Sequence, residues 1–533
     1  MILRGMRSQK MNDFSVAPQI TIEIDGTPLE SEIIQTIREI RIKQMLSAPT
    51  QCEILLPSAH EKLFSEILFK IGSDVHIKIG QIKKHLFYGH ITAVEYLYSK
   101  FVNPLISIRA YDLLHQLRKH QPVRVHVHVN FQQLAQELTQ DLGIQVLGGE
   151  ITPVKSRLFQ YNQSDFQLLH DVGESCGQYF FLNKDCLQIT SLEGTNTDQV
   201  LTLGGNLFEA QFSLNAETIT DSLTVTGWNL QRTTSHSKTI EASVARADVQ
   251  NALVSSNFDF KSERTIVDYC AQDEDQADVV AQAEFDKHTI RQVTLKGVVE
   301  GNPELIPGVA VQVAGVATSL AGQYVLTEVI HSIDSEKGFI SQISTSPPAP
   351  AHIKTGKNAT IGIVSQVNDP DNLGRIKVCL PTYNSIETDW LEVLSLGAGS
   401  NKGQLIVPDV GDNVLLLFVN NEPSQSIVLG GLYGEKDLPG EIIKDGSVIR
   451  FVTQTPGNQR VSLDDSDDSI RLKTKSGHSI NITPNKINIT RDNGSFISLT
   501  NELISIHSES DLVIEAPGNS ITFRSSRVDF EET

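Results

Sequence analysis

The last hundred residues of the chain carry a repeated pattern of apolar and polar positions. Pairs of apolar residues flank a single residue, and the first members of successive pairs lie 7–10 residues apart. The eight pairs are Ile470/Leu472, Ile480/Ile482, Ile487/Ile489, Ile497/Leu499, Ile504/Ile506, Leu512/Ile514, Ile521/Phe523 and Val528/Phe530. The middle residue is polar in every pair except the sixth, where it is Val513. Ile449/Phe451 and Val461/Leu463 extend the pattern toward the N-terminus.

This pattern predicts short strands with one apolar face. Successive side chains of a strand point to opposite faces, so each pair places two apolar side chains inward and turns the middle residue to water. We therefore predict a β-helix or β-prism over residues 436–533, with the first five pairs, Ile470 to Ile506, as its core. Alone, such a stack has open sheet edges and a thin core, and winding three identical chains together would protect both. A β-sandwich with short strands and a single-chain β-helix that closes on itself are the alternatives.

Residues 1–345 show a mixed pattern of strands and helices. Apolar and polar residues alternate in Val75–Ile79, and Leu105–Arg109 is a second strand candidate. Three stretches have apolar residues at helical spacing, with starts at Asp112, Asn130 and Gln163–Phe166, and Gly143 stands where a C-cap glycine belongs.

A proline-rich segment separates this part from a second one. Ser346–Pro350 holds three prolines, which neither a helix nor a central strand accommodates, so we predict a stiff linker over residues 346–357. Residues 358–435 then predict a small β-barrel, because several short strands are joined by turn-forming stretches. The strand candidates are Thr360–Val367, Arg375–Leu380, Leu391–Leu396 and Val414–Phe418.

Composition and charge restrict the classes of function. The chain has 533 residues, 44 Lys and Arg against 64 Asp and Glu, and a net charge of −20, so we expect no general binding to nucleic acid or anionic membrane surfaces. Hydrophobic residues make up 39% and charged residues 20%, as in folded globular proteins. The longest apolar run, Val414–Val419, is too short to span a bilayer. No apolar stretch precedes Lys10, so we expect no signal peptide and folding in the cytoplasm.

The five cysteines do not suggest a disulfide framework. They are Cys52, Cys176, Cys186, Cys270 and Cys379, which are odd in number and widely spaced. Reduced thiols are the main interpretation, and a Cys176–Cys186 bond around a hairpin is the minor alternative.

No catalytic or metal-binding motif stands out. His126 and His128 share one strand face in the predicted Val125–Val129 strand, but no third ligand lies nearby, so we favour a solvent-facing strand edge over a metal site. The run Asp464–Asp468, which carries four carboxylates, lacks EF-hand spacing and is more typical of a solvated turn than of a calcium site. His507 should face outward without a role. We expect no enzyme activity and no cofactor.

Taken in order, these segments resemble the central spike proteins of contractile injection machines, which include the VgrG proteins of type VI secretion, phage tail hub and spike proteins, and the spikes of extracellular phage-tail-like particles. The resemblance covers nearly the whole chain. In the first part it is carried by Leu86–Thr92, Ile108–Leu114, Phe159–Tyr161, Ser164–Phe166, Gly177–Phe180, Val225–Trp228, Pro307–Gly308, Gly322–Tyr324 and His331. In the barrel segment it is carried by Gly362–Val364, Asp369–Pro370, Leu373–Val378, Trp390, Pro408, Gly411–Asp412, Phe418 and Val428–Tyr433.

The resemblance implies a fold and a set of partners. The fold is mainly β with some helices: a hub domain of two barrel-like subdomains over residues 1–345, an oligonucleotide/oligosaccharide-binding (OB)-type barrel over 358–435 and an intertwined trimeric prism over 436–533. The implied partners are the chain itself as a homotrimer, inner-tube and baseplate proteins at the hub end, a PAAR-type tip protein at the C-terminal end, and transiently the target membrane. Arg527, Val528, Asp529 and Phe530 are the residues we expect to contact the tip protein. Because Arg524–Thr533 holds no histidine, a metal-bound tip of the chain itself is not expected.

The function implied is mechanical. Such a spike adapts a trimeric tip to a hexameric inner tube and punctures the target envelope, after assembly in the bacterial cytoplasm. The gap between Tyr433 and Ile449 is too short for an inserted lysozyme domain, and we expect no toxin domain after Phe530. The alternative is a β-helix protein that binds or degrades glycans, but no Trp or Tyr follows Tyr433 to form a sugar platform.

Overall fold

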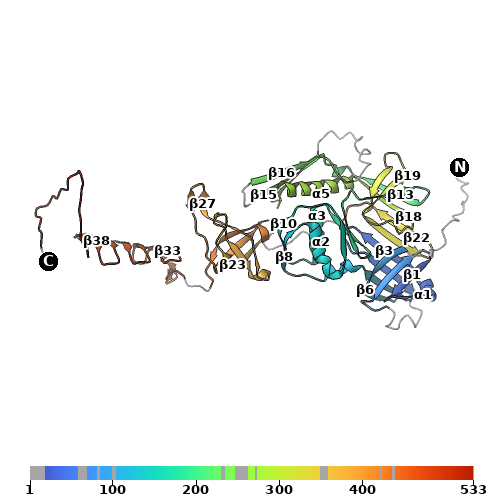
Figure 1. Cartoon of the computed structure of the whole chain (residues 1–533), viewed down its shortest axis with the longest axis horizontal. Coiled ribbons are helices and arrows are strands. Elements are labelled where there is room, and N and C mark those ends of the chain that lie inside the picture. The colour runs from blue at the N-terminus through green and yellow to red at the C-terminus, as the bar shows by residue number, and fades with distance from the viewer. Residues whose placement is uncertain are drawn as a thin grey trace. The chain divides into compact units, whose positions relative to one another are not determined.

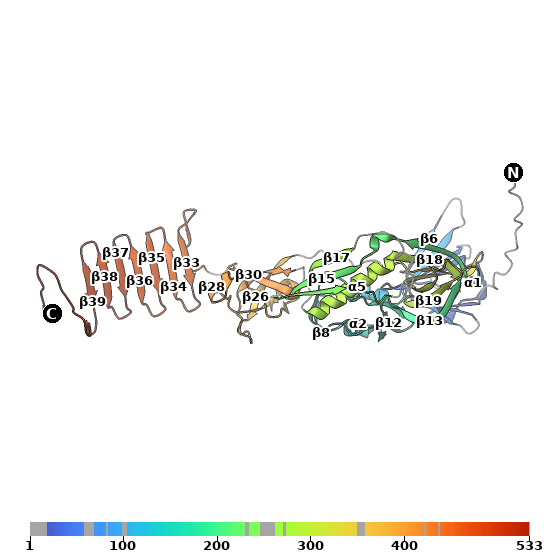
Figure 2. The ribbon, with the colours of Figure 1, turned by 90° about the horizontal axis from the view of Figure 1, so that it is seen from above.

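The computed structural model describes residues 19–57, 69–80, 84–98, 104–229, 234–245, 262–269, 273–348, 358–419, 423–434 and 438–531. Strands dominate these residues, and the predicted mainly β fold is confirmed (Figures 1 and 2). The chain divides into two compact units, Met1–Gly431 and Leu432–Thr533, and each is described by itself.

An eleven-stranded antiparallel sheet forms the frame of the first unit. Its order is β14-β18-β22-β21-β3-β4-β7-β6-β5-β1-β2. The strands are β1 (Ile20–Ile24), β2 (Thr27–Pro28), β3 (Glu39–Met45), β4 (Gln51–Pro57), β5 (Asp74–Ile79), β6 (Lys84–Leu97), β7 (Leu105–Tyr111), β14 (Leu207–Leu214), β18 (Val293–Glu300), β21 (Glu328–Asp334) and β22 (Gly338–Ser344), with the short helix α1 (Ser31–Thr36) after β2. The predicted strands at Val75–Ile79 and Leu105–Arg109 lie within β5 and β7.

This sheet serves two separate apolar cores. Inward residues of β1 and β3–β7, such as Ile22, Ile54 and Leu56, form the first core. The second core lies between β14, β18, β21 and β22 of the same sheet and a smaller one of β13 (Thr195–Thr202), β19 (Val309–Ala314) and β20 (Gly322–Val325). Two cores enclosed by strands fit the predicted pair of barrel-like subdomains.

Three helical segments fall where the sequence predicts them. Asp112 caps a 3₁₀ helix, η1 (Leu113–Arg118), by accepting a hydrogen bond from the Leu114 amide. Asn130 and Ser164 form capping boxes at α2 (Phe131–Thr139) and α3 (Asp165–Ser175), each with a glutamine three residues later. Gly143 has a left-handed backbone (φ 66°) after the 3₁₀ turn η2 (Gln140–Leu142) that continues α2.

These helices pack against short strands. The strands are β8 (Arg124–Val129), β10 (Lys155–Gln160), β9 (Gln145–Gly148), β11 (Tyr179–Asn183) and β12 (Cys186–Thr190), and β8 pairs only with β10 in an antiparallel ribbon. A further helix, α5 (Glu274–Gln292), was not predicted from the sequence. It covers β15 (Ser222–Asn229) and β16 (Thr234–Ile240), which form a sheet with β17 (Glu263–Tyr269) (Figure 2).

Residues 359–432 form the predicted OB-type barrel. The sheet order is β25-β24-β23-β29-β30-β26, and a bridge between Ile376 and Leu391 joins its two ends. The strands are β23 (Ala359–Gln366), β24 (Lys377–Leu380), β25 (Ile386–Glu387), β26 (Glu392–Val393), β29 (Asn413–Phe418) and β30 (Ser426–Leu432). The predicted Leu391–Leu396 strand is wrong in length: only Glu392 and Val393 pair with β30, and Leu396 begins a separate hairpin of β27 (Leu396–Gly399) and β28 (Lys402–Gln404).

Two of the barrel motifs have direct structural reasons. A Cβ atom on Gly362 would lie 2.2 Å from Cγ1 of Val378, so no larger residue fits there. Arg375 donates two hydrogen bonds to the buried Asp369, from Nε to Oδ2 at 3.0 Å and from Nη2 to Oδ1 at 2.7 Å. This guanidinium holds the pKa of Asp369 well below its usual range.

Cysteine and linker predictions are tested only in part. Cys52, Cys176, Cys186 and Cys379 are free thiols, so the Cys176–Cys186 alternative is wrong. Cys270 lies outside the described residues, as do residues 349–357 of the predicted linker.

The second unit is a single antiparallel sheet of seven short strands in sequence order, after a small β31–β32 hairpin (Ile443–Lys444 and Ser447–Val448). The strands are β33 (Arg450–Gln454), β34 (Arg460–Asp464), β35 (Ser469–Lys473), β36 (Ser479–Thr483), β37 (Lys486–Thr490), β38 (Phe496–Thr500) and β39 (Ile504–His507). Figure 2 shows this ladder of strands face-on. Its end strands β33 and β39 do not pair with each other, so within one chain the sheet neither closes into a β-helix nor forms a sandwich among the described residues.

Candidate functional site

The most distinctive surface of the molecule is the apolar face of the second unit. Strand register aligns the repeated pairs into two ladders that cross β34–β39. One ladder is Leu463, Ile470, Ile482, Ile487, Leu499 and Ile504, and the other is Val461, Leu472, Ile480, Ile489, Ile497 and Ile506. We name these twelve side chains the apolar face. The ten residues predicted as the prism core all belong to it.

None of the residues that the structure describes covers this face. Its members from Ile470 to Leu499 are 37–44% exposed, and Ile504 and Ile506 are more exposed still. Isolated exposed apolar residues are ordinary, but a continuous strip of them marks an interaction surface. Completing the burial of one such side chain stabilises an assembly by roughly 1 kcal/mol, and the apolar face has twelve of them.

The opposite face of the sheet carries a polar row. Ser462, Arg471, Asn481, Asn488, Ser498 and Ser505 lie directly across from one another on successive strands. Ser462 and Ser498 are buried between longer neighbours even in one chain, so in the single chain the middle row is less exposed than the apolar face. The prediction that the middle residues point to water therefore fails for these two serines.

Two of the four carboxylates in the acidic run, Asp464 and Asp467, pair with arginines. Asp464 accepts hydrogen bonds from Arg450 Nε at 2.7 Å and from Ser466 Oγ at 2.6 Å, and it forms an ion pair with Arg471. Ser466 and Arg450 lower the pKa of Asp464 to about 2. Arg471 also pairs with Asp467. Asp464 is thus engaged in cross-strand ion pairs and Asp467 in a local one. Among the described residues no group of three His, Cys, Asp or Glu side chains is arranged to hold a metal ion.

The last three apolar pairs do not form strands. Residues 508–531 of the single chain contain no strand, which corrects the expectation for Leu512/Ile514, Ile521/Phe523 and Val528/Phe530. Arg527, Val528, Asp529 and Phe530 are all exposed, and their role in tip contact stays a prediction.

The two strand histidines do not share a face. His126 is buried, and its Nδ1 lies 2.7 Å from Glu137 Oε2, whereas His128 is exposed with a left-handed backbone (φ 53°). The positive φ breaks the strand alternation at His128, so the predicted solvent-facing edge is wrong for His126. His507 is exposed, and its Nε2 lies 3.0 Å from Glu509 Oε1.

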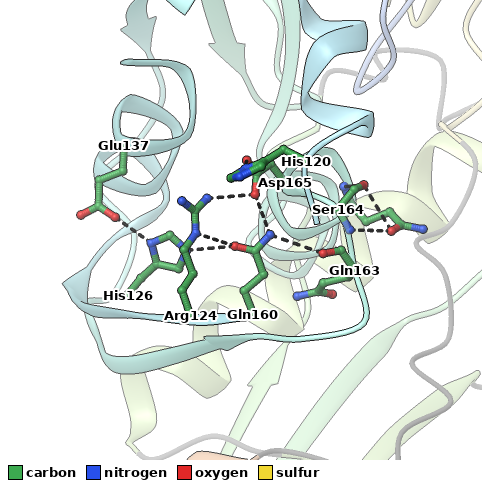
Figure 3. Close-up of polar contacts among 9 residues, drawn as sticks. His120, Arg124, His126, Glu137, Gln160, Gln163, Ser164 and Asp165 are labelled. Carbon is green, nitrogen blue, oxygen red and sulfur yellow. Dashed lines mark hydrogen bonds and ion pairs between the residues drawn. The ribbon is translucent and has the colours of Figure 1, made fainter. Parts of the chain in front are cut away.

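His126 belongs to a polar network that the sequence did not reveal (Figure 3). At its centre is the buried Asp165, the first residue of α3. Its Oδ1 accepts from Arg124 Nη2 at 2.9 Å and from Gln160 Nε2 at 2.6 Å, and its Oδ2 lies 2.7 Å from His120 Nδ1. Arg124 Nε also donates to Gln160 Oε1 at 2.8 Å. The only sequence signal at this place is the Ser164 cap, which accounts for the helix start but not for the buried charge.

Comparisons with known proteins assign the class. The model of the Alg8 N-terminal domain matches residues 15–335, the type VI secretion system/phage-baseplate injector OB domain matches residues 360–433, and the phage baseplate V C-terminal trimerisation domain matches residues 450–513. The first match alone spans more than half of the chain. The chain therefore belongs to the family of the Alg8 N-terminal domain. The matches of its two later segments to the injector OB domain and to the baseplate trimerisation domain support a place among the VgrG and phage-baseplate spike proteins.

Individual relatives match in part. The type VI secretion system spike protein VgrG3 of Vibrio cholerae is 32% identical over 111 residues, which are 19% of this chain and 11% of that protein. The actin cross-linking toxin VgrG1 of the same species is 30% identical over 104 residues, 18% of this chain and 10% of the toxin. The chain thus spans about a tenth of the length of these curated relatives.

Solved structures show the same fold at low sequence identity. The E. coli c3393 protein, a component of the type VI secretion system, superposes with a TM-score of 0.52 at 13% identity, over 77% of this chain and 99% of that one. A chain of the Francisella PdpA–VgrG complex superposes with a TM-score of 0.53 at 9% identity, over 93% of this chain and 89% of that one.

Proposed function

We propose that three copies of this chain form the central spike of a contractile injection particle. The observation that carries the proposal is the apolar face, a strip of isoleucine and leucine side chains about two-fifths exposed over β35–β38. Its match to a trimerisation domain over residues 450–513 supports a second and a third copy as its cover. Three sheets that face one another would give a narrow needle with a close-packed interior, which resists compression.

The mechanism of such a spike is mechanical. Contraction drives the tube and spike forward, and the needle concentrates the force on a small area of the target envelope. We assign inner-tube and baseplate proteins to the hub and a PAAR-type tip protein to Arg527–Phe530. No helix in the described part of the chain is long and apolar enough to cross a membrane.

An activity of the kind named for the actin cross-linking toxin is not part of the proposal. The matched stretch is a tenth of that toxin. The glycan-binding alternative requires an aromatic or acidic platform on the second unit. On this unit Asp464 pairs instead with Arg450 and Arg471, and Arg471 also pairs with Asp467.

The solution mass tests the proposal. One chain has a mass of 58.7 kDa, so light scattering should give about 176 kDa, three times that mass, for the full chain. Removal of residues 441–533 should lower the stability of the trimer or abolish it. A full chain that stays at the monomer mass at micromolar concentration would refute the trimeric needle and favour the glycan-binding alternative.

A further inference from the structure

The β8–β10 ribbon has two chemically different faces. Its register sets Val125 against Phe159, and Arg124 against Gln160. Directly opposite residues share a face and neighbours along a strand alternate, so Val125 and Phe159 lie on one side and Arg124 and Gln160 on the other. One face is therefore apolar, and the other carries the Asp165 network of Figure 3.

The side of the ribbon that carries Val125 and Phe159 belongs to the core of the OB-type barrel. Phe159 is 1% exposed and Tyr161 is 8% exposed, and both lie in one apolar cluster with barrel residues such as Val378 and Leu416. The Tyr161 ring meets the barrel's Tyr383 edge-on, with 5.3 Å between ring centroids, and Tyr383 meets Phe418 in the same way at 5.8 Å. The hub segment thus supplies side chains to the interior of the barrel more than 200 residues further along the chain.

A hydrogen bond between the ribbon and the barrel fixes how the barrel is oriented. Arg157 lies on the same ribbon face as Phe159, two residues before it, and its Nη1 donates to the backbone carbonyl of Glu387 at 2.5 Å. Glu387 belongs to β25, an end strand of the barrel sheet. A charged donor on a fixed carbonyl specifies one orientation of the barrel, which apolar packing alone does not do.

The polar face holds the ribbon on the hub. Asp165 fixes Arg124 and Gln160 to the start of α3, and Glu137 fixes His126 to α2. Buried charges tolerate few geometries, because any displacement leaves a desolvated group without its partner. The polar side of the ribbon is therefore held to α2 and α3, while its other side packs into the core of the barrel.

We propose that the β8–β10 ribbon is a non-covalent clasp that fixes the OB-type barrel on the hub independently of the proline-rich connection. Hub and barrel then move as one body. The mechanical use of this joint rests on the proposed function: load from the hub reaches the barrel through Phe159, Tyr161 and Arg157 and does not depend on the chain segment 346–357.

Cleavage of the connection tests the clasp in the full-length protein. A recognition sequence for a site-specific protease is inserted between residues 350 and 357, the purified protein is cut, and both fragments are followed by size-exclusion chromatography with light scattering. We expect the fragments to co-elute after cleavage. The double variant Phe159→Ala/Tyr161→Ala should release the barrel fragment, with association weakened at least about tenfold, since each truncation removes a buried aromatic side chain.

A matched control and a milder variant complete the design. Phe208→Ala on β14 removes a phenylalanine of the hub that is 46% exposed and outside the barrel cluster, and it should leave co-elution unchanged. If the double variant fails to fold, Arg157→Glu tests the clasp in its place. Position 157 is partly exposed, and the variant places a carboxylate next to the Glu387 carbonyl. It should also weaken the association of the fragments about tenfold.

The outcomes separate the clasp from the spike. Wild-type fragments that part on cleavage, or a folded Arg157→Glu variant that associates as tightly as wild type, overturn the clasp. A cleaved protein whose fragments co-elute at the mass of one chain supports the clasp while refuting the trimer. A trimer whose fragments part refutes the clasp alone.

Discussion

The two units of the chain use the same strand chemistry with opposite results. In the first unit, inward residues such as Ile22, Ile42 and Leu56 are fully buried because they pack against other inward residues of the same chain. In the second unit, isoleucines at equally regular positions stay about two-fifths exposed because no strand or helix among the described residues packs over the sheet. A sheet with one apolar face needs a cover, and where one chain does not supply it, other copies must.

The largest expected effect is the loss of the contacts between copies that cover the apolar face. Ile489→Asp places a carboxylate in the middle of the apolar face, three times over in a trimer, where burial of an unpaired charge costs several kcal/mol per copy. We expect the trimer to dissociate at micromolar concentration, as measured by light scattering, while the first unit keeps its thermal transition.

Asn488→Asp is the matched control for this variant. Asn488 adjoins Ile489 in β37 but belongs to the polar row on the other face of the sheet. The same carboxylate should leave the mass of the assembly unchanged there. Equal dissociation of both variants would show that the two faces do not differ as the burial argument requires.

A pair of leucine truncations sharpens the comparison. Leu56→Ala in the first core should destabilise the first unit by about 2–5 kcal/mol, with a melting temperature that does not depend on protein concentration. Leu499→Ala in the apolar face acts through association, so its transition should shift with protein concentration. Calorimetry at two concentrations that differ tenfold distinguishes the two cases, and a concentration-independent Leu499→Ala transition would contradict the assembly model.

Local signals account for the elements that the sequence predicts well. Side-chain caps at Asn130 and Ser164 and strict alternation in β5 act within a few residues, so they are visible without knowledge of the fold. Helix α5 was missed because its buried face is built largely from small residues such as Ala277 and Ala281, which give a weak helical pattern. Leu391–Leu396 was misjudged because its pairing is set by β30 and by Ile376, which lie elsewhere in the chain.

The two functional surfaces, the apolar face and the clasp, also differ in how far the sequence predicts them. The apolar face follows from a repeat of apolar pairs, so its residues were predictable down to Ile504/Ile506. The last three pairs have a similar spacing but form no strand in residues 508–531, so the spacing alone did not predict their structure. The clasp was not predictable, because Phe159 and Tyr161 are separated from the barrel by more than 200 residues and alternation does not reveal which core they enter.

The smallest expected effect concerns the ion pairs at the first strands of the second unit. Folding lowers the pKa of Asp464 to about 2, below its value in an unfolded chain, through Ser466 and Arg450. A carboxyl whose pKa is lowered stabilises the folded state above about pH 4, and this contribution disappears as the pH falls toward 2. Asp464→Asn should therefore melt a few degrees below wild type at pH 7, and the two melting temperatures should converge between about pH 4 and pH 2.

The difference between the two curves isolates Asp464 from the other acidic groups, which titrate in both proteins. Apolar burial does not depend on pH, so the apolar face should still hold the assembly in the variant at pH 7. A difference that stays constant down to pH 2 would mean that the arginine pairs of Asp464 do not contribute to the stability of the second unit.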